Sequence, residues 1–269
     1  GRDMSALFIA CRDLFLDDRY TAVCRLHTKK SPHLHSGRAE LFKRHSVENL
    51  LNSEGYTTNV LDLFRDKPWV GVAVPPIMHI SLGTLGHGWL GNRPRVEALA
   101  AMLGLKTPIE ATPPTAVYGG MFWFRPRALR KLFAHPWTWT DFEDEPYPLD
   151  GALGHALERM VCYVAQDAGF TTQQIISTHS AGWNYGMLEY KLQKLEAALP
   201  NADFGYRVRI VENWRNASYS QSSSVRQSLA ALVLAVKRSA GHRLPRLVHA
   251  LRPVYRTATL RHLRSRGDR

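Results

Sequence analysis

The candidate catalytic carboxylates stand in one short acidic stretch of the chain, between a predicted strand and a predicted helix: Glu143, Glu145 and Asp150. Asp150 occupies the position expected for the N-cap of that helix, because apolar residues recur every three or four positions over 153–164. The strand, 119–126, is a short apolar and aromatic run that contains Arg125. A carboxylate held near an arginine suits a general base that faces an anionic substrate, with Glu143 or Glu145 as substitutes. The alternative is that Asp150 only caps its helix.

A basic loop follows the first predicted strand, which spans 20–27. Its lysines, histidines and hydroxyls lie at the carboxyl edge of the strand, where open α/β sheets bind ligands. These groups could hold a diphosphate by charge and hydrogen bonds, whereas a solvated basic turn is the alternative. The candidate donor-binding residues are Arg2, Asp3, His27, Lys29, Lys30 and Arg125.

Aromatic and polar side chains supply the candidate substrate contacts: Trp89, Asn92, Trp123 and His155. Trp89 and Asn92 lie in a long glycine-rich loop, 81–92, and Asn92 is expected to cap a helix over 93–102. Trp89 could instead pack beneath the loop, and His155 could have a structural role. The segment 135–145 combines tryptophans with carboxylates, which suits a sugar site or an acidic surface loop.

The pattern of predicted strands and helices that position these residues indicates an α/β fold. The continuous apolar runs at 69–74 and 119–126 are typical of buried strands, and 170–177 is expected to be an edge strand. Helical periodicity marks several segments between and after them: 4–16, 41–51, 58–64, 93–102, 127–133, 153–169 and 185–199. We therefore expect an open, mostly parallel sheet flanked by helices.

Composition excludes several classes of protein. With 269 residues and 45% hydrophobic content the chain can bury a sizeable core, and no apolar run reaches the ~18 residues needed to span a bilayer. Without a signal sequence, a cytoplasmic location is expected. The three cysteines, Cys11, Cys24 and Cys162, are too few and too far apart for a disulfide framework or a metal site, so we expect them reduced.

The net charge of +12 is concentrated at the C-terminus. Residues 225–269 carry 11 lysines and arginines against one acid, net +10, whereas 1–224 carry 24 against 22, net +2. Leucines and valines keep helical spacing there, which favours a basic amphipathic helical extension on an anionic membrane surface over a disordered tail. Nucleic-acid binding ranks last, because Tyr255 alone offers a stacking ring in this segment. Deleting 225–269 and measuring liposome and DNA binding would test both interpretations.

Four segments together resemble the rhamnan synthesis F family of bacterial cell-surface polysaccharide enzymes. They are His27-Thr28-Lys29-Lys30-Ser31-Pro32, Gly91-Asn92-Arg93, Gly119-Gly120-Met121-Phe122-Trp123-Phe124-Arg125, and the stretch from Asp150-Gly151 to Glu158-Arg159. The resemblance covers about 1–177. Family members carry a further α/β segment before the Gly-Arg-Asp that opens this chain, so we expect the front end of the domain to lie outside it.

The resemblance implies an inverting, GT-A-like glycosyltransferase of O-antigen or lipopolysaccharide assembly. The basic tail would make it peripheral on the inner membrane. The resemblance also implies rhamnosyl transfer from a nucleotide sugar, dTDP-rhamnose, to a glycan or lipid-linked glycan acceptor. Where GT-A enzymes place two metal-binding carboxylates, this chain has Lys29 and Lys30, which would neutralise a diphosphate directly and repel a cation. We therefore expect transfer without Mg²⁺ or Mn²⁺, and no bound metal.

The expected organisation is a transferase domain at 1–182, a packing helix and connection at 183–219, and a linker and basic tail at 220–269. A different function remains open, that of a noncatalytic carbohydrate-binding or scaffold domain in a larger polysaccharide synthase. Titration with nucleotide sugars separates the two, because an enzyme binds the nucleotide and a pure glycan-binding module does not.

Overall fold

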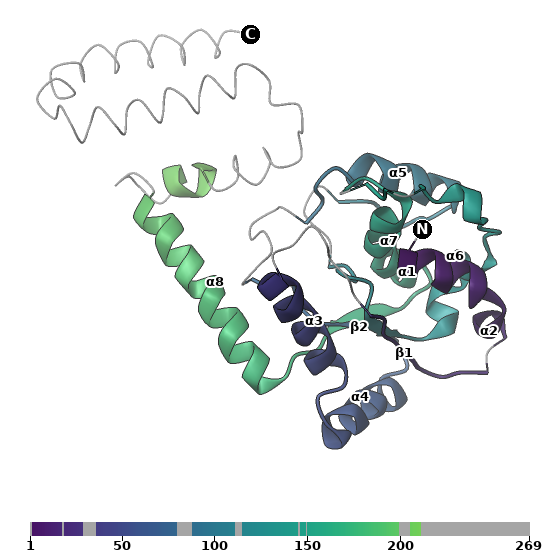
Figure 1. Ribbon diagram of the computed structural model, residues 1–269, viewed down its shortest axis with the longest axis horizontal. Coiled ribbons are helices and arrows are strands. Elements are labelled where there is room, and N and C mark those ends of the chain that lie inside the picture. The colour runs from purple at the N-terminus through teal and green to yellow at the C-terminus, as the bar shows by residue number, and fades with distance from the viewer. Residues whose placement is uncertain are drawn as a thin grey trace, which may run out of the picture. The chain divides into compact units, whose positions relative to one another are not determined.

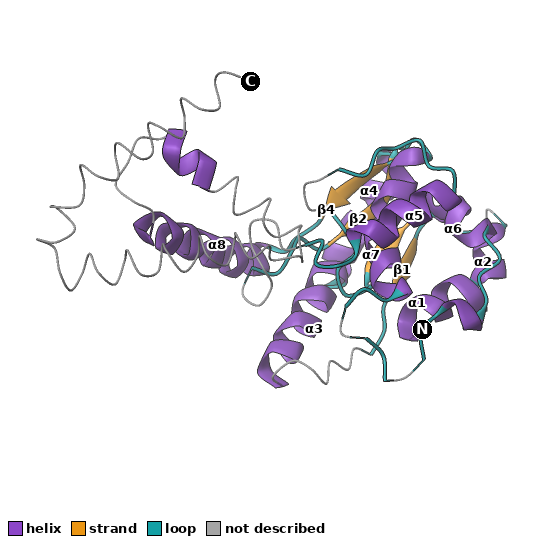
Figure 2. Ribbon diagram, turned by 90° about the horizontal axis from the view of Figure 1, so that it is seen from above, coloured by secondary structure: helices purple, strands orange, loops and turns teal. Residues whose placement is uncertain are grey.

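Four short strands form one sheet in the spatial order β1, β3, β2, β4. They are β1 (Val23–Arg25), β2 (Val70–Val74), β3 (Phe122–Phe124) and β4 (Thr171–Gln174). Strands β1 and β2 are labelled in Figure 1, and β4 is labelled with them in Figure 2. The computed structural model describes residues 2–17, 19–28, 36–79, 88–110, 115–144, 146–148, 150–198 and 205–210. Within them the α/β class is confirmed, and β4 is the predicted edge strand. The basic extension at 220–269 lies outside the described residues and stays a prediction from sequence.

The sheet is mixed, which corrects the expectation of a mostly parallel one. β3 runs antiparallel to both β1 and β2, and only β2 and β4 pair in parallel within the described sheet. Gly119 and Gly120 precede β3 with φ of 84° and 71°. This left-handed backbone, which glycine adopts without strain, lets the chain enter β3 from the edge of the sheet where β1 ends.

Helices cover both faces of the sheet (Figure 1). One layer contains α1 (Arg2–Ser5), the π-helical turn η1 (Ala6–Ala10), α2 (Arg12–Leu16), α5 (Arg93–Met102), the 3₁₀ turn η2 (Pro126–Leu129), α6 (Arg130–Ala134) and α7 (Leu153–Asp167). The other contains α3 (Ser36–Leu50) and α4 (Glu54–Asp66). Most of the predicted helices are thus confirmed.

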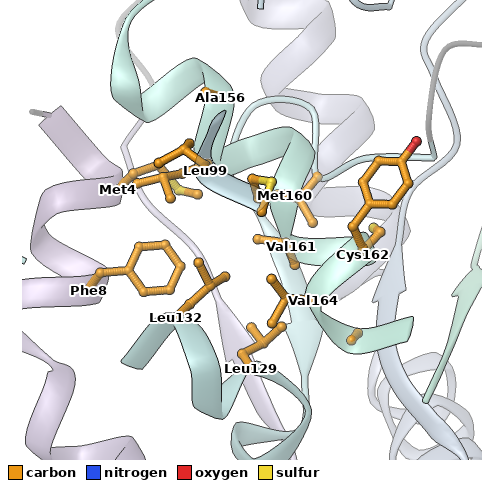
Figure 3. Packing of buried hydrophobic residues seen from close by; sticks show 14 of the residues in the cluster. Met4, Phe8, Leu99, Leu129, Leu132, Ala156, Met160, Val161, Cys162 and Val164 are labelled. Atoms are coloured by element: carbon orange, nitrogen blue, oxygen red, sulfur yellow. The ribbon is translucent and has the colours of Figure 1, made fainter. Parts of the chain in front are cut away.

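Strand β3 supplies aromatic side chains to both layers. Successive strand residues point to opposite faces, so Phe122 and Phe124 join the larger core, with α7, while Trp123 joins the smaller core, with Phe64 of α4. Figure 3 shows the larger core, in which side chains of α1, η1, α5, η2, α6 and α7 meet. The apolar run that predicted a buried strand therefore serves both faces.

Helix α7 fixes which edge of the sheet holds which residue. It is buried over most of its length, and its C-terminal end leads within a few residues to Thr171, which pairs with Val70 at the start of β2. The N-terminal end of α7 therefore lies toward the opposite edge, where β1 and β2 end.

Helix α8 (Thr178–Ala198) is attached to the sheet region through its first turns. The buried side chain of Asn184 accepts a hydrogen bond from the His79 amide (2.7 Å) and donates one to the Ile77 carbonyl (3.0 Å). Among the described residues, no helix is long and apolar enough to cross a membrane.

All three cysteines are free thiols. We expect reduced core residues from the sequence, and Cys162 is buried, whereas Cys11 and Cys24 are only partly buried. Burial raises the pKa of both Cys24 and Cys162 to about 12, so these two thiols stay protonated near neutral pH.

Candidate functional site

The Asp150 carboxylate is held in front of α7 and does not cap it. Its Oδ2 accepts a hydrogen bond from the Gly91 amide (2.7 Å), and its Oδ1 accepts one from Nδ2 of Asn92 (2.6 Å). The N-cap position belongs to Ala152, and Gly151 has a φ of 78°, which turns the chain away before the helix begins. The predicted cap role of Asp150 is therefore wrong, and its partly exposed carboxylate faces the 88–92 segment.

Glu143 satisfies the start of α7 in place of Asp150. Both of its carboxylate oxygens accept from the Leu153 amide (3.1 and 2.9 Å), and Oε1 also pairs with Arg95 of α5. Burial acts to raise the pKa of Glu143, but these hydrogen bonds and the Arg95 charge outweigh it and lower the pKa. Glu143 is therefore ionised and engaged in structure, which leaves Asp150 as the better candidate base.

Asn92 occupies the predicted N-cap position of α5, but its side chain has another task. It makes no capping hydrogen bond. Instead the buried Nδ2 donates to Asp150 and to the Trp89 carbonyl (3.1 Å). Asn92 thus fixes the Asp150 carboxylate to the segment before α5.

Trp89 and His155 lie beside this group in different ways. Trp89 is fully buried and stacks on Tyr163 of α7, with ring centroids 6.2 Å apart, so it packs beneath the loop as the alternative reading held. His155, in the first turn of α7, is partly exposed, with its ring edge-on to Tyr147 (5.5 Å). Of the two, His155 is the more exposed, and its role in substrate binding stays a prediction.

A second group lies where β1 ends and β3 begins. Asp3 Oδ2 is 3.3 Å from Nη2 of Arg25 and 3.3 Å from Nε2 of His27. The His27 ring also contacts the Gly119 carbonyl (2.8 Å). Arg25 is nine-tenths buried. Gly120 has a φ of 71°, and a Cβ there would lie 2.8 Å from Nη1 of Arg25, so any other residue would be strained and would displace this side chain. The structure thus brings the predicted residues Asp3 and His27 together.

Segment 115–121 joins the two groups. The Val117 amide donates to the Glu158 carbonyl of α7 (3.2 Å), and the Arg159 guanidinium lies over the Tyr118 ring at 5.6 Å. Two residues further on, Gly119 contacts His27. Asp150 and His27 therefore lie toward the same edge of the sheet, the one where β1 and β2 end.

Arg125 and Trp123 do not belong to this edge. Because β3 is antiparallel to β1, Phe124 pairs with Val23, and Arg125 lies at the opposite edge from His27. Arg125 is 4% exposed and donates to three main-chain carbonyls, those of Val70, Thr21 and Phe64. The predicted grouping of Arg125 with the donor-binding residues is corrected accordingly.

Trp123 of β3 is buried, and its Nε1 donates to the Leu50 carbonyl (3.1 Å). The predicted contact of Trp123 with the substrate is therefore corrected as well.

Some predicted site residues lie outside the described part of the chain: Lys29, Lys30, Glu145 and the side chain of Arg2. Their donor-binding and catalytic assignments stay predictions. In the part of the chain that the structure describes, no three histidine, cysteine, aspartate or glutamate side chains gather in a way that could hold a metal ion.

Comparison with known protein families gives a match over the part of the chain that contains both groups of residues. The sequence model of rhamnan synthesis protein F matches residues 1–170, which include every described residue of both groups. The chain belongs to the rhamnan synthesis protein F family. The description of the family refers to rhamnan synthesis. No solved structure matches the chain.

Two relatives of this chain are each described as uncharacterized protein WxcX. They come from two strains of Xanthomonas campestris pv. campestris. Strain B100 has 31% identity and strain ATCC 33913 has 30%, each over 178 residues that make up 66% of this chain. The chain spans about a quarter of the length of these relatives, 24%.

Sequence reasoning missed two arginines that hold parts of these groups in place. Arg95 lies within a predicted helix and pairs with Glu143, and it also donates to the Gly151 carbonyl (3.0 Å). Arg25 lies within a predicted strand and pairs with Asp3. Neither arginine belongs to a recognisable motif. The only signal in the sequence was that each is a charged residue on an element with one buried face.

A neutral histidine fixes the segment that follows β2. His45 of α3 donates from Nε2 to the Pro76 carbonyl (2.9 Å), so its Nδ1 is left to accept from the Asn49 amide (3.2 Å). Burial lowers the pKa of His45, outweighing the Pro76 hydrogen bond and the Glu48 charge, and burial also lowers the pKa of His79. Protonation of His45 would add a hydrogen to Nδ1, which would then face the Asn49 amide hydrogens and could no longer accept from them.

We expect the free energy of unfolding to fall as the pH drops below about 6.5, where the unfolded histidines take up protons that the folded ones resist. The decline should level off below the lowered pKa values of the folded state. His45→Gln should reduce this pH dependence, while His179→Gln, at an exposed position, should not. Urea unfolding between pH 8 and 5 measures it, and equal pH dependence in wild type and His45→Gln would contradict the assignment.

Proposed function

We propose that the chain is a glycosyltransferase domain that moves a sugar, rhamnose in the first instance, from a nucleotide sugar onto a growing cell-surface polysaccharide. The observation that supports it most is the Asp150 carboxylate, held by Gly91 and Asn92 in front of α7 at one edge of an α/β sheet. The family's role in rhamnan synthesis gives the chemistry its class. A base there has an obvious substrate, the hydroxyl of an acceptor glycan.

The proposed step is one displacement at the anomeric carbon with inversion. Asp150 takes the proton of the acceptor hydroxyl, and the acceptor oxygen forms a bond to that carbon. The bond from the carbon to the diphosphate oxygen breaks, and the nucleoside diphosphate departs with the electron pair. Lys29 and Lys30 stabilise its growing charge in this proposal, which rests on the sequence for these two residues.

The deciding experiment is to incubate the purified chain with a panel of nucleotide sugars and an acceptor glycan and to measure nucleotide release. Release that depends on both the sugar and the acceptor supports a transferase. Because the chain spans 24% of its relatives, a noncatalytic carbohydrate-binding domain is the second candidate. That candidate is favoured if acceptor glycan binds but no nucleotide sugar does.

We further propose that transfer needs no divalent metal, because His27-Thr28-Lys29-Lys30 stands where GT-A enzymes place metal-binding carboxylates. Turnover should be unchanged in excess EDTA. The Asp141–Glu143 segment is a poor substitute metal site, since Asp141 accepts from the Thr138 amide (2.7 Å) and Glu143 binds the start of α7. Loss of turnover in EDTA with recovery on adding Mn²⁺ would contradict the proposal.

A further inference from the structure

A polar cavity of about 470 Å³ lies apart from the Asp150 group. It is lined by the C-terminal half of α7, the start of β4 and the connection that follows α5. At 1.5 Å per residue, the lining residues of α7 lie about 14 Å (Cys162) to 20 Å (Gln166) along the helix from Leu153, so the cavity is separate from the candidate base. It belongs to the edge of the sheet where β2 and β4 begin, opposite the edge that holds His27.

The lining of this cavity is rich in hydroxyl groups. Four threonines contribute to it, together with the amide of Gln166 on the exposed rim: Thr107, Thr115, Thr171 and Thr172. The buried residues Cys162 and Tyr163 also line it, and Phe170 adds an aromatic ring. Two of the hydroxyls have partners within the protein, since Thr171 Oγ1 donates to the Trp69 carbonyl (3.3 Å) and the Thr172 side chain is hydrogen-bonded to Cys162. A hydroxyl with one partner can still make a further hydrogen bond, so hydroxyls and an amide next to a ring suit a ligand with many hydroxyl groups and an apolar face.

The charge of the lining excludes other ligand classes. Glu110 is the only charged side chain among the described residues that line the cavity, and none of them is a lysine, arginine or histidine. Arg127 lies over the Phe170 ring (5.4 Å) but is not among the lining residues, so a phosphate or nucleotide would meet no cation in the described lining itself. Since the pKa of Cys162 is raised to about 12 by burial, its thiol is also no nucleophile at neutral pH.

We propose that this cavity binds a neutral saccharide unit, at a second site separate from Asp150. Its volume lies within the range of small-molecule pockets, roughly 300–1,000 Å³. The site does not depend on the transferase proposal, because a glycan-binding domain would use it equally. In a transferase it would hold a distant unit of the acceptor chain and raise the local concentration of acceptor ends.

The test is to titrate the ¹⁵N-labelled chain with methyl glycosides of neutral hexoses and 6-deoxyhexoses and to map the amide chemical-shift changes. We expect saturable changes at Gln166, Thr171 and Thr172. Gln166→Trp, which fills the rim, should weaken this binding at least tenfold, whereas Gln173→Trp, at an exposed position of β4 outside the cavity, should not. Circular dichroism and the unfolding temperature establish that both variants fold.

Two outcomes would overturn the proposal: no shift change at the cavity with any glycoside, or equal binding by wild type and Gln166→Trp. Asp150→Asn should leave the changes at Thr171 and Thr172 unaltered, as should an added nucleoside diphosphate. If glycosides bind in the cavity but no nucleotide is released, the transferase proposal fails and the cavity proposal stands. If nucleotide is released but no glycoside binds in the cavity, the cavity proposal fails and the transferase proposal stands.

Discussion

Replacing Asp150 by asparagine should lower the turnover of sugar transfer by about 10²–10⁴-fold, the contribution typical of a positioned general base. An amide cannot take the proton of the acceptor hydroxyl, whereas the geometry around position 150 is largely kept. Binding of the nucleotide sugar should change little, because we place the diphosphate on the basic loop and not on Asp150. Turnover from nucleotide release and donor affinity from calorimetry would measure the two effects separately.

Structural side effects of this variant are expected to be small. Asp150 accepts from Gly91 and from Asn92, and an asparagine offers one oxygen for these two donors, so one of them loses its partner at a cost of about 1 kcal/mol. Asp13→Asn is the matched control, since its side chain is 93% exposed and remote from the site in sequence. Full turnover in Asp150→Asn would contradict the assignment and move the search for a base to Glu145.

The elements of this fold follow well from the sequence because they depend on local patterns. The apolar run Phe122-Trp123-Phe124 is a buried strand, and the three-to-four spacing of apolar residues after Leu153 is α7. The boundaries of these elements are less predictable from the sequence. The helix begins three residues after Asp150 because Gly151 takes a left-handed φ, and Glu143, ten residues before Leu153, supplies the hydrogen bonds that a cap would give.

Strand direction could not be read from the sequence, and it decided which site residues meet. A short apolar run suits a parallel or an antiparallel neighbour equally, so β3 was placed in the wrong direction. The antiparallel pairing puts its first residue beside Arg25 and its last beside Val23. Asp3 does meet His27, and Asn92 meets Asp150, whereas Arg125 lies at the opposite edge of the sheet.

The role of Arg125 shows why residue type alone is a poor guide to a binding site. An arginine after a strand suggests a phosphate ligand, but burial and partners are tertiary properties. Here the guanidinium lies under Phe64, with its Cζ 5.5 Å from the ring centroid, and donates to main-chain carbonyls of three segments. Burial lowers the pKa of Arg125, and the nearby charge of Arg127 adds to this effect.

We therefore expect Arg125→Met to destabilise the fold by about 3 kcal/mol, roughly 1 kcal/mol for each carbonyl left without a donor. The three are the carbonyl of Phe64 in α4 (2.7 Å), that of Val70 in β2 (3.3 Å) and that of Thr21 before β1 (3.3 Å). Methionine keeps much of the apolar stem but supplies no donor. Urea unfolding at pH 7 would measure the change in the free energy of unfolding.

Arg127→Met is the matched control, because Arg127 is exposed and its guanidinium lies over Phe170 (5.4 Å) at the surface. Its replacement should cost no more than about 1 kcal/mol, the worth of an exposed cation–π contact. Arg125→Lys should fall between the two, since one ammonium group cannot reproduce the planar fork that reaches three carbonyls. If Arg125→Met unfolds like the wild type yet loses affinity for the nucleotide sugar, the structural assignment fails and the original grouping with the donor-binding residues is restored.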